Sequence, residues 1–198
     1  MSYKQPIQVE CFYSCDKDLA LKVLHGEEEI LPSTNPWDWL GSGVYFWEYN
    51  PTRALSYAVE VASGKQKNKK KIKVPFVLGA IVTLGDCLNL VEPECISLLG
   101  RSYVNFKRLC DFSGIALPIN AGANRELDCA VVQHLHEVKK KTEKKAYDTV
   151  RAAFKEGDEI YPGSSFMSHD HIQVAVNNTD NIKGYFLPTP YHKYNPYL

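Results

Sequence analysis

The hydrophobic pattern of the chain alternates between the two-residue period of a strand and the longer period of a helix. Short segments rich in β-branched and aromatic residues predict strands at 7–15, 43–47, 74–90, 147–154, 172–176 and 182–187. Helices are predicted after Asp16, after Asn50-Pro51 and after Pro93, and again from Glu126 to Lys140. Because the helices are gathered in the first two-thirds of the chain, the order favours an α+β fold over strict βαβ alternation.

The segments between these elements are rich in glycine, proline and polar residues, which predicts loops at 27–40, 64–73, 114–124 and 156–168. Gly79 interrupts the long apolar run at 74–90 and is predicted to mark a β-bulge. The sequence shows neither an internal repeat nor a linker, and its 198 residues suit one folding unit. We therefore expect a single domain over residues 1–198.

Composition excludes a strong overall charge. Lys and Arg together number 23, as do Asp and Glu, so no net field attracts nucleic acid or a membrane. The first residues lack the apolar stretch of a secretory signal, and no apolar run reaches the ~18 residues of a membrane span. We expect a cytoplasmic protein without a membrane partner. Local positive charge comes from two lysine-rich runs, Lys65, Lys67, Lys69, Lys70, Lys71 and Lys73 in the first and Lys139, Lys140, Lys141, Lys144 and Lys145 in the second.

The cysteine and histidine positions do not predict a metal site. None of the six cysteines forms a CxxC pair, so reduced and mostly buried thiols are expected. His134 and His136 are two residues apart in a predicted helix and would not face one metal. His169 and His171 precede a strand and could share a face, but no third ligand is evident.

The segment from Trp37 to Glu48 is the most informative part of the chain, with five aromatic residues around two glycines. Gly43 permits a close backbone approach, and a strand follows it directly. Tyr45 and Phe46 then point to opposite faces of that strand. An aromatic platform beside a glycine suits a flat ring such as nicotinamide or a base, and the same pattern also suits core packing.

This segment resembles a motif of the ADP-ribosyltransferase superfamily, in the His-Tyr-Glu branch of diphtheria toxin and the poly(ADP-ribose) polymerases. The likeness extends to Phe12–Asp16 in the first strand and to a late segment with Phe154–Gly157, Tyr161, Ser165 and His171–Val174. It is closest to bacterial single-domain members of that superfamily. The resemblance implies a fold of two facing sheets, with helices packed around them, that hold nicotinamide in a cleft. It also implies that NAD is the co-substrate.

The resemblance assigns roles by position. Tyr45 would stack on the nicotinamide ring, and Tyr13 occupies the position of the family's histidine, which holds a ribose hydroxyl. Ser14 stands where the family has a glycine whose backbone binds the carboxamide. Gln173 stands at the usual glutamate, and the loop at 155–165 would recognise the target.

Three further side chains are candidates on chemical grounds. Glu156 could stabilise positive charge at the anomeric carbon, and it equally suits a solvated turn. Arg53 and Arg151 could contact the pyrophosphate, because guanidinium matches phosphate geometry. Gly43 and Phe46 would complete the cofactor site beside Tyr45.

Two departures from the family affect the functional prediction. Tyr13 replaces histidine, and a phenol can still form hydrogen bonds but does not titrate near neutrality. Gln173 replaces glutamate and lacks its charge. We expect an NAD-dependent mono-ADP-ribosyltransferase, toxin-like in style, with a macromolecular acceptor and without a metal. The alternative is a fold that binds NAD, ADP-ribose or a protein partner without turnover, and a third, weaker alternative is an RNA-binding module without a nucleotide.

The acceptor of the first hypothesis would be RNA, DNA or protein. Nucleic acid is slightly favoured, because phosphates are attracted to the lysine runs and because Trp37, Trp39 and Tyr161 could stack on unpaired bases. A neutralising antitoxin would be the second partner of such a toxin-like enzyme.

Overall fold

The structure, a computed structural model, describes residues 8–64, 72–122 and 124–198. Within these ranges seven strands form one sheet in the order β4-β7-β8-β2-β1-β3-β9, and a two-stranded hairpin, β5-β6, lies apart from it. The strands are β1 (Gln8–Asp16), β2 (Val44–Glu48), β3 (Pro75–Thr83), β4 (Cys87–Asn89), β5 (Asn120–Ala121), β6 (Asn124–Arg125), β7 (Thr149–Phe154), β8 (His171–Val176) and β9 (Ile182–Phe186). All pairs in the large sheet are antiparallel except β4 with β7.

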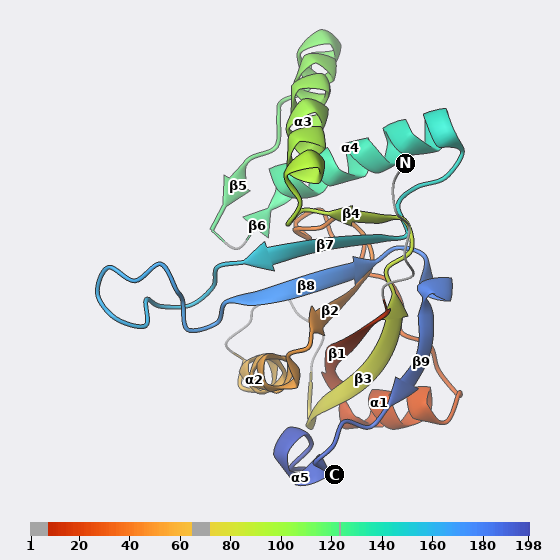
Figure 1. The fold of residues 1–198 in the computed structure, drawn as a ribbon, viewed down its shortest axis with the longest axis vertical. Coiled ribbons are helices and arrows are strands. Elements are labelled where there is room, and N and C mark those ends of the chain that lie inside the picture. Colours follow the sequence, from red (N-terminus) through yellow and green to blue (C-terminus); the bar gives the residue numbers. More distant parts are fainter. Residues whose placement is uncertain (1–7, 65–71, 123) are drawn as a thin grey trace.

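Helices cover both faces of the large sheet (Figure 1). They are α1 (Lys17–Leu24), α2 (Pro51–Ala62), α3 (Pro93–Ser113), α4 (Glu126–Glu143) and α5 (Tyr191–Tyr194), with a 3-10 turn at Thr179–Asn181. The predicted caps of the first two are confirmed: Asp16 accepts a bond from the backbone of Asp18, and Asn50 accepts one from Arg53. The mostly antiparallel sheet with helices on both of its faces confirms the α+β class.

Side-chain alternation divides the core between the two faces of the sheet. The α1 face, which α1 covers, holds the largest cluster, including Cys11, Phe46 and Leu78. On the opposite face, called here the α2/α4 face, α2 packs over Phe12 and Trp47, and α4 packs over the strands at the β4 end. In β2, Val44 and Phe46 therefore belong to the core on the α1 face, and Tyr45 and Trp47 to the core on the α2/α4 face.

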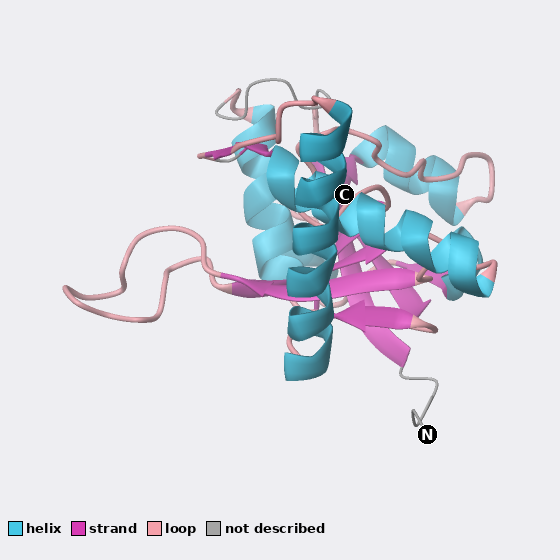
Figure 2. Ribbon diagram, turned by 90° about the horizontal axis from the view of Figure 1, so that it is seen from above, coloured by secondary structure: helices cyan, strands magenta, loops and turns pink. Residues whose placement is uncertain are grey.

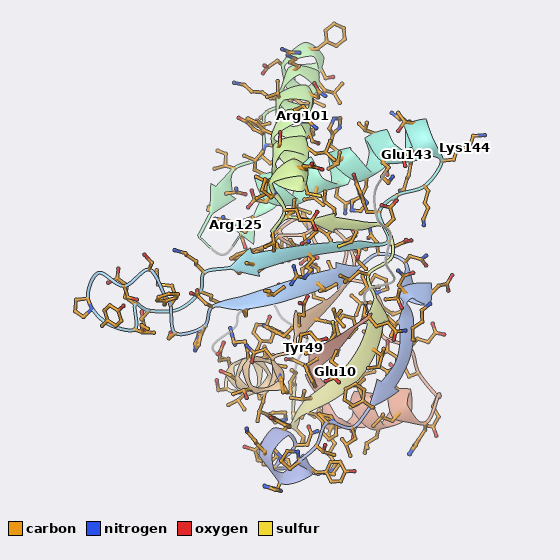
Figure 3. The ribbon with its side chains drawn as sticks, viewed as in Figure 1. Glu10, Tyr49, Arg101, Arg125, Glu143 and Lys144 are labelled. Carbon is orange, nitrogen blue, oxygen red and sulfur yellow. The ribbon has the colours of Figure 1, made fainter. Side chains whose placement is uncertain are left out.

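The pairing between β1 and β2 is the shortest in the sheet among the described residues. Only Cys11–Glu48 and Phe12–Trp47 are paired there among the described residues, whereas β1 and β3 pair over nine positions. Just beyond the join, the N–H of Tyr49 donates to the carbonyl of Glu10 at 2.9 Å, and Figure 3 shows these two residues side by side. The resemblance implied two separate facing sheets, whereas the described residues form one large sheet in which β1 and β2 are joined at only two aligned positions.

Three elements differ from the sequence-based expectation. The run at 74–90 is broken by Gly85, whose φ of 61° turns the chain between β3 and β4. The segment at 114–124 contributes to the β5-β6 hairpin, and α5 is an additional short helix. Within the described residues, no helix is both long and apolar enough to cross a membrane.

The connection between β7 and β8 projects well beyond the sheet in both ribbon views (Figures 1 and 2). We call residues 155–170 the arm. Its two branches pair with each other, because the N–H of His169 donates to Glu156 at 2.9 Å and that of Ser168 donates to Asp158 at 2.8 Å. The arm is therefore a structured hairpin-like projection.

Gly79 does not mark a bulge; the register of β3 shifts between Ile81 and Val82 instead. Gly79 lies opposite Phe186 of β9, and a Cβ added to it would lie 2.5 Å from the Phe186 ring. The glycine is needed because the ring occupies the space of its side chain.

Replacing Gly79 with alanine should therefore lower the free energy of unfolding by about 1–3 kcal/mol, since the ring must leave its position. Gly184→Ala in β9 is the matched control, because a Cβ there has no heavy atom within 4 Å and should change stability little. Urea unfolding of both variants measures the difference. Equal stability of the two would show that Phe186 does not require the glycine.

Candidate functional site

Tyr45 lies in β2 on the α2/α4 face, and its hydroxyl is bound by the preceding turn. The hydroxyl accepts from the N–H of Leu40 at 2.9 Å and donates to the carbonyl of Gly41 at 2.6 Å. Burial raises the pKa of this phenol. The phenol therefore fixes the turn at 40–41 relative to the strand, and its use in stacking on nicotinamide stays a prediction.

Gly43 permits a close backbone approach, as its position in the sequence suggested, but the backbone it meets is that of β8. A Cβ on Gly43 would lie 3.0 Å from the carbonyl oxygen of Val176. Both backbone polar groups of Gly43 also pair with Ser33, at 3.0 and 2.8 Å. Its first role is therefore to seat β2 against β8.

Three predicted residues lie on the α1 face, away from Tyr45. Phe46 is fully buried and is a core side chain, so it presents no surface to a cofactor. Tyr13 is half-buried, with its ring centroid 5.8 Å from that of Phe46, and burial raises its pKa. Arg151 also lies on this face. The sheet thus separates Tyr13 from Tyr45.

Arg151 is held by the protein itself. Its guanidinium forms a two-point ion pair with Glu48, with nitrogen–oxygen distances of 2.6 and 2.7 Å. A third bond, of 3.1 Å, reaches Asn89. Hydrogen bonding to Glu48 raises the pKa of Arg151. This pair links β2, β4 and β7, and a pyrophosphate would have to compete with a carboxylate for it.

Ser14 and Gln173 lie on the α2/α4 face with Tyr45. The Ser14 hydroxyl donates to the carbonyl of Ala54 and so fastens β1 to α2. Gln173 is half-buried in β8 and is aligned with Trp47 of β2 and Ala152 of β7. Trp47 is therefore the cross-strand neighbour of Gln173.

Arg53 is the centre of a polar cluster where the arm meets α2. Although only 5% exposed, it forms ion pairs with Glu60 at 3.2 Å and with Glu156 at 3.1 Å. The other oxygen of Glu156 lies 3.5 Å from Nδ1 of His171. Two of the predicted site residues, Arg53 and Glu156, are thus brought together by direct contact.

Aromatic rings surround the Arg53 guanidinium. Its central carbon lies 6.0 Å from the ring centroid of Trp47 and 5.7 Å from that of Tyr57. These two rings are 5.0 Å apart, and the Trp47 and His171 centroids are 6.4 Å apart. We call Trp47, Arg53, Tyr57, Glu156 and His171 the Arg53 cluster. It combines flat apolar surfaces with one cation and one partly exposed carboxylate.

Three buried nitrogens of this cluster have no hydrogen-bond partner in the described structure: Trp47 Nε1, Arg53 Nε and His171 Nε2. Nδ1 of His171 lies 2.6 Å from the carbonyl of His169, so it must donate. In the neutral ring Nε2 is then an acceptor, whereas the Trp47 and Arg53 atoms are donors. Buried unsatisfied groups each cost about 1–3 kcal/mol, so a ligand that pairs with them would gain that energy.

Trp47, Tyr57 and His171 were not predicted as site residues. Trp47 belongs to the aromatic segment, but the face it occupies depends on the register of β2. His171 was considered as a possible metal ligand and as part of the late segment that carries the resemblance, without a role in the site. Among the described residues, no group of three or more His, Cys, Asp and Glu side chains could hold a metal ion.

The second lysine run is partly neutralised by the fold. Lys139 is buried and forms ion pairs with Asp86 and Glu143, while Lys140 pairs with Glu137 and Lys145 with Asp148. The first run, apart from Lys73, lies outside the described residues.

Comparison of the chain with models of protein families, with curated proteins and with solved structures gave no match in any of the three.

Two buried histidines should make stability pH-dependent. Burial lowers the pKa of His136 to about 4 and also lowers the pKa of His171. Below their unfolded pKa of about 6.5, the unfolded chain takes up protons that the native chain does not. The free energy of unfolding should thus be highest above pH 6.5. It should fall by up to about 1.4 kcal/mol per pH unit for each histidine as the pH decreases.

Urea unfolding between pH 7.5 and 5 measures this slope. His136→Gln should flatten it, whereas replacing the exposed His192 with glutamine should leave it unchanged. The same dependence of unfolding free energy on pH in wild type and His136→Gln would contradict the contribution assigned to His136.

Proposed function

We propose that the chain is an NAD-dependent mono-ADP-ribosyltransferase whose Arg53 cluster holds the nicotinamide end of NAD. The observation that carries the proposal is the set of unpaired atoms on Trp47, Arg53 and His171, two donors and one acceptor. A primary carboxamide offers the complementary groups, because its oxygen accepts and its nitrogen donates. Nicotinamide adds a flat ring that suits the neighbouring aromatic side chains.

The reaction would use the carboxylate of Glu156. When the bond between the nicotinamide nitrogen and the ribose carbon breaks, the bonding electron pair stays on nicotinamide and the ribose carbon becomes positively charged. The nucleophile of the acceptor then attacks this carbon. A carboxylate near that carbon stabilises the charge. Glu156 is 39% exposed at the base of the arm, where a dinucleotide and an acceptor could both approach it.

Entry of the ligand requires movement. The three unpaired atoms are covered by protein, so the side chains of the cluster or the base of the arm must be displaced before a ligand reaches them. The ion pair between Arg53 and Glu156 is the contact that such a movement would open.

The acceptor in this proposal is a nucleic acid. Three apolar side chains of the arm are each more than half exposed: Ile160, Tyr161 and Phe166. Exposed aromatic rings such as those of Tyr161 and Phe166 stack on unpaired bases. The arm has one lysine, Lys155, and four carboxylates, Glu156, Asp158, Glu159 and Asp170, so the support for a nucleic-acid acceptor comes from stacking and not from the charge of the arm. The arm contains residues 155–165, the loop to which the resemblance assigned target recognition.

One observation favours the alternative, a binding module without turnover. Glu156 is already paired with Arg53 and His171, which reduces the field it exerts on a ribosyl cation, and Gln173 carries no charge. Such a protein would bind NAD or ADP-ribose through the same unpaired atoms.

The test is incubation of the full chain with NAD labelled in the adenosine half, in the presence of RNA, DNA or a protein lysate. We expect nicotinamide release and labelled nucleic acid. Glu156→Gln should reduce the rate by about 100-fold or more, since it removes the charge that stabilises the transition state. Asp158→Asn, two residues further along the arm, is the matched control and should retain the rate.

Binding is measured separately by titration of NAD. Trp47→Phe keeps an aromatic ring but removes the indole N–H donor, and it should weaken NAD binding by about tenfold. Binding without nicotinamide release would establish the alternative, and labelled protein in place of nucleic acid would change the acceptor class. Absence of both NAD binding and nicotinamide release would refute the proposal.

A further inference from the structure

A cavity of about 360 Å³ lies between α4, the segment at 145–148 and the residues after β8. Its lining includes Ser42, His136, Lys140, Lys145 and Asn177. It is at the other end of β8 from His171, six residues away, which is about 20 Å along a strand. The cavity is therefore separate from the Arg53 cluster.

His136 is an unusual group in this lining because it is only 1% exposed. Both of its ring nitrogens contact the same atom, Nδ2 of Asn177, at 3.2 and 3.1 Å. A neutral imidazole has one donor and one acceptor, and an amide nitrogen can only donate. This contact can satisfy the acceptor nitrogen alone, so the N–H of the ring remains without an acceptor. The Asn177 amide nitrogen also donates to the carbonyl of Tyr147 at 3.5 Å, which supports this orientation of the amide.

The charge of the lining favours an anion. Lys140 and Lys145 contribute two ammonium groups that are each more than half exposed, and Asp148 contributes one carboxylate. The Asp148 carboxylate is occupied: it accepts from the backbone of Asp86, from Lys145 and from Asn178. Glu137 pairs with Lys140 at 2.7 Å on the exposed side of α4. The lining itself therefore carries one net positive charge, which becomes zero when Glu137 is included, and an anion would have to replace Glu137 or Asp148 as the partner of these lysines.

Burial, with a smaller contribution from Lys140, keeps the pKa of His136 low, at about 4. At neutral pH the ring is uncharged and presents its N–H as a donor. An anionic oxygen that displaces the Asn177 amide would accept from this N–H and from the lysines together.

We propose that this cavity binds the phosphate group of a small phosphorylated ligand. The phosphate oxygens accept from His136 and from the Lys140 and Lys145 ammonium groups. The volume exceeds that of a phosphate ion and lies within the range of about 300–1,000 Å³ found for small-molecule sites. The remainder of the space holds the organic part of the ligand. This site is independent of the proposed transferase function.

The test is titration of the full chain with inorganic phosphate and with ribose 5-phosphate, at an ionic strength held constant with chloride. The imidazole nitrogen resonances of His136 report binding at the cavity directly. We expect them to shift with both probes, and ribose 5-phosphate to bind more tightly because it fills more of the cavity.

Lys140→Gln should raise the dissociation constant by about tenfold, since a charge-assisted hydrogen bond is lost. Lys141→Gln, the adjacent residue outside the lining, is the matched control and should retain wild-type affinity. The proposal is overturned if the His136 resonances do not move, or if both lysine variants weaken binding equally. Neither outcome affects the NAD test, which uses a different ligand and different residues.

Discussion

The position of β2 between β1 and β8 is the constraint on which the rest of the site depends. Its register with β8 directs Tyr45 and Trp47 to the α2/α4 face, and alternation then directs Phe46 and Glu48 to the α1 face. A shift of one residue would exchange the two sets. The pairing of Gly43 with Ser33 and its close contact with Val176 hold this register in place.

Local signals in the sequence predicted most of the elements. Asp16 and Asn50 cap the helices that follow them, because a short polar side chain satisfies the free N–H groups of the first turn. The long apolar run at 74–90 was predicted as one strand because periodicity alone does not show where such a run turns. Gly85 followed by Asp86 was the available signal for the break.

The candidate site was predicted only in part, for a physical reason. The guanidinium of Arg53 suggested pyrophosphate binding, and the carboxylate of Glu156 suggested stabilisation of positive charge. The contact between these two residues, however, joins positions more than one hundred residues apart in the sequence. The separation of Tyr13 from Tyr45 follows from strand register, which short motifs do not specify. Likewise, the second lysine run was predicted as a source of local positive charge, whereas Lys139, Lys140 and Lys145 have carboxylate partners. Asp86 comes within reach of Lys139 only in the folded chain, while Glu137 and Asp148 lie three residues from Lys140 and Lys145 in the sequence.

The two ends of the arm are held together at the Arg53 cluster. Glu156 at its start binds Arg53 directly, and His171 at its end touches the same carboxylate, while the intervening residues extend away from the sheet (Figure 1). Closing a loop costs little more entropy when the loop is lengthened. Changes of length near 160–166 should therefore cost the strands little stability, because the ion pairs at the base hold the two ends of the arm together.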